Sequence, residues 1–143
     1  MRVRRGTSAD VPRALEIWRS AVDATHQFLS PADRAGIDAQ VAGEFLPNAM
    51  LWIAADDRDR PMGFLVMDGA RIEALFVDPA VHRQGYGSML MDHAVSLEPG
   101  LTVDANEQAR HAVHFYLRKG FRIVGRSPTD EQGRPYPLVH LSR

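Results

Sequence analysis

Val77-Asp78-Pro79-Ala80-Val81-His82-Arg83-Gln84-Gly85-Tyr86-Gly87-Ser88-Met89-Leu90 is the stretch that decides the fold. An apolar run at residues 72–77 predicts a strand that stops at Asp78-Pro79. A Gly-x-Gly follows, and the spacing after it predicts a helix from Gly87 to about Leu97. The face of that helix expected to be buried carries Leu90, Ala94 and Leu97.

This strand-to-helix turn has the features of an anion site. Gly85 and Gly87 lack a Cβ, so a ligand can come close to the backbone. The free N–H groups of a helix start carry partial positive charge, and Arg83 adds a formal one. Phosphate is the most natural occupant, and a turn that binds nothing is the alternative. Leu90 stands where a dinucleotide fingerprint needs a third glycine, and no P-loop Gly-Lys-Ser/Thr follows.

Composition limits the classes of protein. The chain has 143 residues, 45% of them apolar, which predicts one globular domain over residues 1–143. A formal net charge of −1 argues against a nucleic-acid binder that works through bulk charge. With no cysteine, any thiol chemistry must use a thiol brought by a cofactor. The basic start is followed by no apolar run, and no stretch is long enough for a membrane span. We therefore expect a cytoplasmic protein without membrane partners.

Periodicity along the chain predicts alternating helices and strands in the order β-α-α-β-β-β-α-β-α-β-β. A capping box at Thr7 and Asp10 starts the first helix, and Ser30-Pro31 starts a second that runs to about Phe45 and stops before Pro47. Asp68-Gly69 predicts a hairpin in an antiparallel meander. The remaining expected segments are strands at 2–4, 50–55, 62–67, 71–77, 101–103, 121–126 and 138–141, and a last helix at 106–119 with Gly120 after it.

Two stretches carry a family resemblance. His82-Arg83-Gln84-Gly85-Tyr86-Gly87 resembles the coenzyme A signature of the GNAT acetyltransferase superfamily, Gln/Arg-x-x-Gly-x-Gly/Ala, with His82 departing from the first position. Residues 106–121 resemble the superfamily's Asn-x-x-Ala-x-x-Phe-Tyr-x-x-x-Gly-Phe, with Ala109 at the usual asparagine and Asn106 one turn earlier as its stand-in. The order of elements resembles the GNAT fold over nearly the whole chain.

That resemblance implies an α/β fold: a mixed, mostly antiparallel sheet flanked by four helices. The fourth and fifth strands would be parallel and splay apart, and acetyl-coenzyme A (acetyl-CoA) would lie in the gap. A backbone N–H of the strand 75–77 would polarise the thioester carbonyl. The residues expected to bind the cofactor are Leu75, Phe76, Val77, His82, Arg83, Gln84, Gly85, Tyr86, Gly87, Ser88, Asn106 and Tyr116.

Three residues are candidates for proton transfer. Tyr116 lies on the inner face expected for the last helix, and the family motif implies that it protonates the leaving thiolate; a core tyrosine bonded to a carbonyl is the alternative. Glu73 is the candidate base, since burial on an interior strand would raise its pKa; the alternative is a residue near the strand end that reaches solvent or pairs with Arg71. Asp104, expected just after the fifth strand, would hold the amine or pass protons, unless it only caps the last helix.

The first two helices, the loop between them and the last hairpin cover the acceptor side in the resembled fold. The residues expected there are Trp18, His26, Phe28, Trp52 and Tyr136, each with a core or anchoring role as its alternative. His111 and His114 are three residues apart on a helix, but no further ligand stands at a supporting spacing, so we expect no metal.

The leading hypothesis is an N-acetyltransferase that moves acetyl from acetyl-CoA to a primary amine by direct attack in a ternary complex. The alternatives are a non-catalytic acyl-CoA-binding sensor, and an interaction module with an unused turn. The acceptor stays open among small-molecule and peptide amines, and the resemblance leaves open a homodimer.

Overall fold

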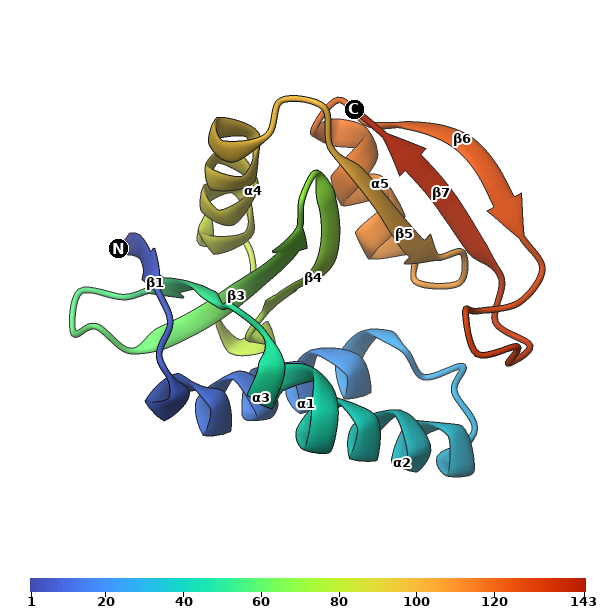
Figure 1. Cartoon of the computed structure of the whole chain (residues 1–143), viewed down its shortest axis with the longest axis horizontal. Helices are drawn as coiled ribbons and strands as arrows, with labels where there is room; N and C mark the ends of the chain where they lie inside the picture. Colours follow the sequence, from blue (N-terminus) through green and yellow to red (C-terminus); the bar gives the residue numbers. More distant parts are fainter. The chain divides into compact units, whose positions relative to one another are not determined.

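The computed structural model describes residues 1–143 as a seven-stranded sheet with the strand order β1-β2-β3-β4-β5-β7-β6 (Figure 1). The order of helices and strands along the chain matches the predicted order. The elements are β1 (Arg2–Arg5), α1 (Val11–Thr25), α2 (Pro31–Gln40), α3 (Leu46–Asn48), β2 (Trp52–Ala55), β3 (Pro61–Asp68), β4 (Arg71–Val77), α4 (Tyr86–Leu97), β5 (Thr102–Asn106), α5 (Arg110–Arg118), β6 (Arg122–Ser127) and β7 (Leu138–Ser142).

The chain divides into two compact units. The first contains Met1–Val66 and Ala74–His93, and the second contains Met67–Glu73 and Ala94–Arg143. Strands β3 and β4 and helix α4 each contribute to both units.

The first unit is built on an antiparallel meander and the helices that precede it. β1 pairs with β2, and β2 with β3, both antiparallel. Its core includes the fully buried side chains of Ile17, Leu46, Ile53 and Phe64. The capping box is confirmed, since Asp10 accepts the Thr7 N–H at 2.8 Å, although a short 3-10 turn at Ser8–Asp10 comes before α1.

The predicted stop before Pro47 is wrong. A π turn at Val41–Phe45 follows α2, and the chain stays helical through Pro47 to Asn48. Proline lacks the N–H that a continuing helix would use, but it is tolerated in a first turn. Because the π turn ends the regular α2 pattern, Pro47 enters as a first-turn residue of α3, and the whole segment acts as one helix.

The second unit is an antiparallel three-stranded sheet backed by a helix. β7 pairs with β5 on one side and with β6 on the other, and α5 packs on β5. β4 joins β5 in parallel, with Arg71 opposite Thr102 and Ile72 opposite Val103. This confirms the predicted parallel pairing.

Two predicted boundaries in this unit are wrong. β5 runs on to Asn106 because its residues pair with β7, so Asp104 lies inside the strand and Asn106 ends it. α5 therefore begins at Arg110, not Asn106. At its other end Gly120 follows the helix as predicted and has a φ of +91°. The Phe121 N–H donates to the Tyr116 carbonyl at 3.0 Å, which closes a Schellman motif.

Helix α4 begins one residue earlier than predicted, at Tyr86. Leu90 and Ala94 are fully buried, but Leu97, expected on the same face, is 45% exposed. It is the last residue of the helix, so the neighbours that cover Leu90 and Ala94 do not reach it.

Candidate active site

The turn between β4 and α4 is held by an ion pair from α1. Arg13 donates to the Asp78 carboxylate at 2.7 Å and to the Pro61 carbonyl at 3.1 Å. Asp78 also accepts the Ala80 N–H at 2.9 Å. Burial opposes the charge on Asp78, but these donors outweigh it and hold its pKa below the usual range. Arg13 could not be named from the sequence, because no local pattern links it to a carboxylate 65 residues away.

The backbone of this turn takes an uncommon shape. Arg83 has a φ of +65° and Gly85 a φ of +95°. The left-handed conformation costs a non-glycine residue about 1–2 kcal/mol, so its presence at Arg83 indicates that the turn geometry is imposed. A Cβ built on Gly85 would meet nothing within 4 Å, so the space beside this backbone is open.

The same turn presents the start of α4. Met89 N–H donates to the Gly85 carbonyl at 3.0 Å, which makes Gly85 the cap residue of the helix. The N–H groups of Tyr86, Gly87 and Ser88 then have no acceptor inside the helix. These three N–H groups lie at the start of a helix of twelve residues, next to Arg83 and to the open space at Gly85. Such an arrangement can bind a phosphate group.

The other residues expected to hold the cofactor fall in two places. Leu75, Phe76 and Val77 end β4 within the first unit and are each half-buried. His82 and Gln84 are exposed in the turn, whereas the Tyr86 side chain is only 6% exposed, which leaves its backbone as the accessible part. Asn106 and Tyr116 belong to the second unit.

Tyr116 is buried on α5, with its ring packed edge-on against Phe115 and Phe121. Burial raises the pKa of its phenol, which keeps the hydroxyl protonated at neutral pH. No side-chain hydrogen bond joins that hydroxyl to another protein group. The bond to a backbone carbonyl, which was the alternative to an acid role, is therefore not formed.

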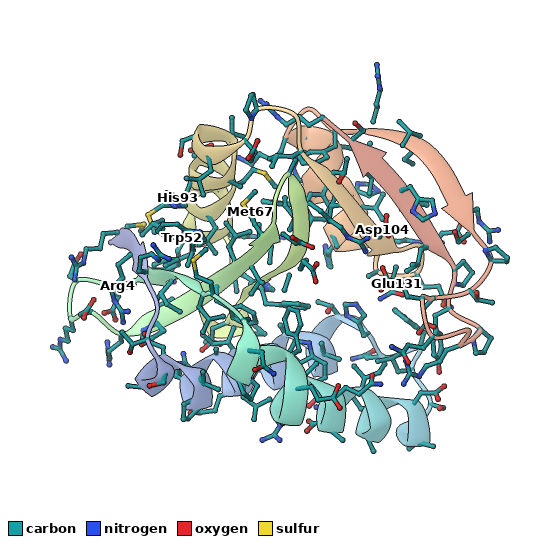
Figure 2. The ribbon with its side chains drawn as sticks, in the orientation of Figure 1. Arg4, Trp52, Met67, His93, Asp104 and Glu131 are labelled. Atoms are coloured by element: carbon teal, nitrogen blue, oxygen red, sulfur yellow. The ribbon has the colours of Figure 1, made fainter.

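Asp104 lies in the middle of β5 and is bonded on both carboxylate oxygens. His140 Nδ1 is 2.6 Å from Oδ1, and Arg71 donates to Oδ2 at 3.3 Å. Arg71 also binds Glu131 in the loop between β6 and β7; Figure 2 labels Asp104 and Glu131. The alternative role for Asp104, a cap on the last helix, is wrong because five residues of strand and turn separate it from α5.

Glu73 does not have the burial that its predicted role assumed. The outward residues of β4 in this unit, Arg71 and Glu73, are exposed, while Ile72 between them is buried. The strand is covered on one face only at this end. The charge of Glu73 acts on Arg71, which supports the exposed alternative, and its role as a base stays a prediction.

His26 follows the last residue of α1 and is half-buried. Thr25 uses its one hydroxyl proton to bond the Ala21 carbonyl at 2.7 Å, so its oxygen must accept from His26 Nδ1, also at 2.7 Å. This bond places the ring proton on Nδ1 and leaves the lone pair on Nε2. Burial lowers the pKa of His26 to about 4, so the imidazole is neutral at pH 7 and acts as a hydrogen-bond acceptor.

The large rings predicted for the acceptor side have different surroundings. Phe28 packs on His26 with ring centres 5.3 Å apart. Trp18 is 5% exposed and belongs to the core, with Arg34 stacked 4.9 Å from its ring centre, so its core alternative is the observed one. Trp52 on β2 packs edge-on against His93 of α4 (Figure 2). Tyr136 is 7% exposed in the loop before β7.

No group of three or more His, Cys, Asp or Glu residues is placed to hold a metal ion. His111 and His114 are both exposed on α5. None of the helices has the length and apolar character needed to cross a membrane.

Comparison with known proteins assigns the family. The model of the acetyltransferase (GNAT) domain matches residues 47–123, more than half of the chain. The chain belongs to the GNAT acetyltransferases and is an acetyl-CoA-dependent N-acetyltransferase. This confirms the resemblance and decides for the enzyme over the non-catalytic binder.

The relatives are similar over almost their full length. Peptidyl-lysine N-acetyltransferase YjaB of Salmonella typhimurium strain LT2 is 48% identical over 97% of this chain and 95% of its own. The protein of the same name from Escherichia coli K12 is 44% identical over 98% of this chain and 95% of its own length. The solution structure of the apo form of Escherichia coli YjaB superimposes with a TM-score of 0.93 at 43% identity, over 98% of this chain and 95% of that one. This agreement confirms the predicted GNAT fold.

Proposed function

We propose that this chain transfers the acetyl group of acetyl-CoA directly to the side-chain amine of lysine in a peptide or protein. The choice of this acceptor rests on two relatives named peptidyl-lysine N-acetyltransferase. They are 48% and 44% identical to this chain over nearly its whole length. The exposed face of β4 and β5, with Glu73 and Asp104 beside Arg71, is consistent with a cationic acceptor.

The turn before α4 would bind the phosphates of coenzyme A. The N–H groups of Tyr86, Gly87 and Ser88 would donate to phosphate oxygens, helped by the open backbone at Gly85 and by Arg83. His82 and Gln84 would line the turn, and the end of β4 at Leu75, Phe76 and Val77 would direct an N–H at the thioester carbonyl. Asn106, the last residue of β5, stays a proposed cofactor-binding residue.

Tyr116 would act as the acid for the departing thiolate. Its hydroxyl is protonated, and no protein group competes for it. Lysine has an ordinary pKa of about 10.4, so it arrives charged and must lose a proton before it can attack. His26, Phe28, Trp52 and Tyr136 remain the proposed acceptor-side residues, with His26 Nε2 available to accept a hydrogen bond.

The test measures thiol release from acetyl-CoA with two matched peptides. One has a free lysine and a blocked N-terminus, and the other has a free N-terminus and acetyl-lysine. The assay has no background from the enzyme, because the chain contains no cysteine. We expect turnover with the first peptide only. Turnover with the second peptide alone would overturn the lysine acceptor.

Binding is checked separately by thermal unfolding. Acetyl-CoA at a hundred times its dissociation constant should stabilise the chain by about 2.7 kcal/mol, or a few degrees. Free coenzyme A should do the same and ATP should not. No shift with acetyl-CoA would contradict the proposed site at the start of α4.

A further inference from the structure

Three side chains from adjacent strands form a continuous hydrogen-bonded chain in the second unit. Ser127 Oγ, at the end of β6, is 2.7 Å from His140 Nε2 on β7. His140 Nδ1 is 2.6 Å from Asp104 Oδ1 on β5. Arg71 of β4 donates to the other oxygen of Asp104 at 3.3 Å and also binds Glu131. We call Ser127, His140 and Asp104 the relay.

The partners determine where the protons lie. Asp104 accepts from Arg71 and is a carboxylate, so the close contact with His140 requires the proton on Nδ1. Nε2 then has the lone pair, and the Ser127 hydroxyl must donate to it. This is the order hydroxyl, imidazole, carboxylate, in which a carboxylate orients the ring and stabilises the imidazolium that forms when Nε2 takes a proton.

The backbone of β6 leaves room for the imidazole ring of His140. β6 has an irregularity between Ile123 and Gly125, and Gly125 then stands opposite His140. A Cβ on Gly125 would lie 3.3 Å from His140 Cδ2, tighter than an ordinary contact. The ring is 33% exposed and Asp104 is 25% exposed. The imidazole is therefore held in one place, yet it can still be reached by water or substrate.

We propose that His140 is the proton acceptor of the acetyl transfer and receives, through the Ser127 hydroxyl, a proton that the lysine ammonium loses. This inference rests on the proposed function. As the ammonium N–H bond breaks, its proton passes to Ser127 Oγ while the hydroxyl proton moves to His140 Nε2, and the imidazolium later releases it to water. After the attack the nitrogen loses a second proton to solvent. The thiolate takes its proton from Tyr116, and the phenolate then recovers one proton from solvent, so that one proton is released overall. Asp104 and Arg71 are positioning residues in this scheme.

An imidazole suits this task better than the nearby carboxylates. Ordinary pKa values are about 4 for a carboxyl group, 6.5 for imidazole and 10.4 for lysine, so the imidazole is the stronger base by more than two units. Among the charged groups, Asp104 on β5 contacts the ring directly, and Arg71 on β4 binds the other oxygen of that carboxylate. The Asp104 carboxylate lies 2.6 Å from the ring and attracts a cationic acceptor such as a lysine ammonium.

The deciding variant is His140→Asn. The asparagine amide N–H replaces Nδ1–H and keeps a donor for Asp104, but it cannot accept a proton at the position of Nε2. General-base catalysis contributes about 10²–10⁴-fold, so kcat for the lysine peptide at pH 7 should fall by about 10²-fold, with KM for acetyl-CoA and the acetyl-CoA thermal shift unchanged. Ser127→Ala should lower kcat less, since water can replace the hydroxyl. His114→Asn, on the exposed face of α5, is the control and should behave as wild type.

The pH profile separates proton transfer from a structural effect. As pH rises from 7 toward 10, more of the lysine is neutral without help, so the loss caused by His140→Asn should shrink from about 10²-fold to a few-fold. A loss that stays constant with pH, or an Asn variant with full activity, would overturn the proposal and leave His140 an orienting residue.

Two further outcomes are decisive. Acetyl found on Ser127 by mass spectrometry after incubation with acetyl-CoA would overturn the relay, because the serine would then be a nucleophile. If the wild-type chain acetylates a different primary amine, the proposed lysine acceptor fails, and the same pH comparison with that amine still tests His140. If the wild-type chain acetylates no amine, both proposals fail.

Discussion

At the scale of the residue, the first prediction concerns the removal of the Tyr116 hydroxyl. Tyr116→Phe removes a group that bonds to no other protein atom, so the free energy of unfolding should change by less than about 1 kcal/mol. If the hydroxyl protonates the thiolate, kcat should fall by about 10²-fold or more, and the acetyl-CoA thermal shift should remain. Thiol release and thermal unfolding measure the two effects. Unchanged kcat would remove Tyr116 as the acid.

Single residues could be named from the sequence where a local motif marks them, and could not be named where their partners come from distant strands. Tyr116 stands in a recognisable Phe-Tyr pair, and Gly85 stands in a Gly-x-Gly, so both could be named from sequence. Ser127 and His140 stand in no motif: their relation to Asp104 arises from the pairing of β5, β6 and β7. Glu73 was expected to be buried because an interior strand usually is, but its outer face near Arg71 is open.

The turn that begins α4 gives the second prediction, at the scale of the element. Gly85→Ala puts a Cβ at a φ of +95°, which should cost about 1–2 kcal/mol of unfolding free energy, and it fills the open space proposed for phosphate. The acetyl-CoA thermal shift should be lost or greatly reduced. Gly69→Ala, at a φ of +57° in the β3–β4 turn with equally open surroundings, is the matched control and should keep the shift. Equal shifts in both variants would place the ligand elsewhere.

The contact between α1 and α2 gives a pH-dependent prediction. Arg19 and Arg34 both bond to Asp38 at 2.8 Å and lower its pKa to about 2. In the unfolded chain the pKa of Asp38 is about 4. The bonds therefore stabilise the fold above about pH 4, and this contribution disappears as the pH falls from 4 to 2. Solvent screens the pair, because Arg19 is 46% exposed, so about 1 kcal/mol is expected.

Asp38→Asn tests this contribution. Urea unfolding should show a loss of about 1 kcal/mol at pH 7 that shrinks steadily below pH 4. Asp92→Asn, exposed on α4, should have little effect at either pH. A loss for Asp38→Asn that is the same at pH 7 and pH 3 would show that the ion pairs are not its cause.

Element boundaries show why local patterns were insufficient. Asp104, Asn106 and their neighbours are polar enough to read as a turn into a helix, and both residue types are uncommon in strands. Pairing with Leu138 and His140, more than thirty residues away, keeps them in β5. Helix ends with local chemistry, such as Ser30 bonding the Asp33 N–H or Gly120 after α5, were placed correctly. Nonlocal pairing therefore explains the misplaced start of α5.

At the scale of the whole molecule, the fold was predictable because the local sequence signals and the longer family motifs indicate the same order of elements. Hairpin, capping and crossover signals predicted an element order that the sheet confirms, and the two motifs fall at the start of α4 and along α5. The composition does not mark the two compact units into which the chain divides, and a single domain over residues 1–143 stays a prediction. The division lies within strands β3 and β4 and helix α4, where no linker composition marks it.

The absence of cysteine from the whole chain supports the final prediction, direct transfer in a ternary complex. Because no cysteine thiol can carry the acetyl group, we expect both substrates to be bound before the acetyl moves. Initial rates measured over a grid of acetyl-CoA and lysine-peptide concentrations should give intersecting double-reciprocal lines, whereas a covalent acetyl-enzyme gives parallel ones. N-ethylmaleimide should not inhibit, and intact-mass analysis after acetyl-CoA treatment without acceptor should show no added acetyl at Ser127. Parallel lines together with an acetylated chain would require a nucleophile other than cysteine.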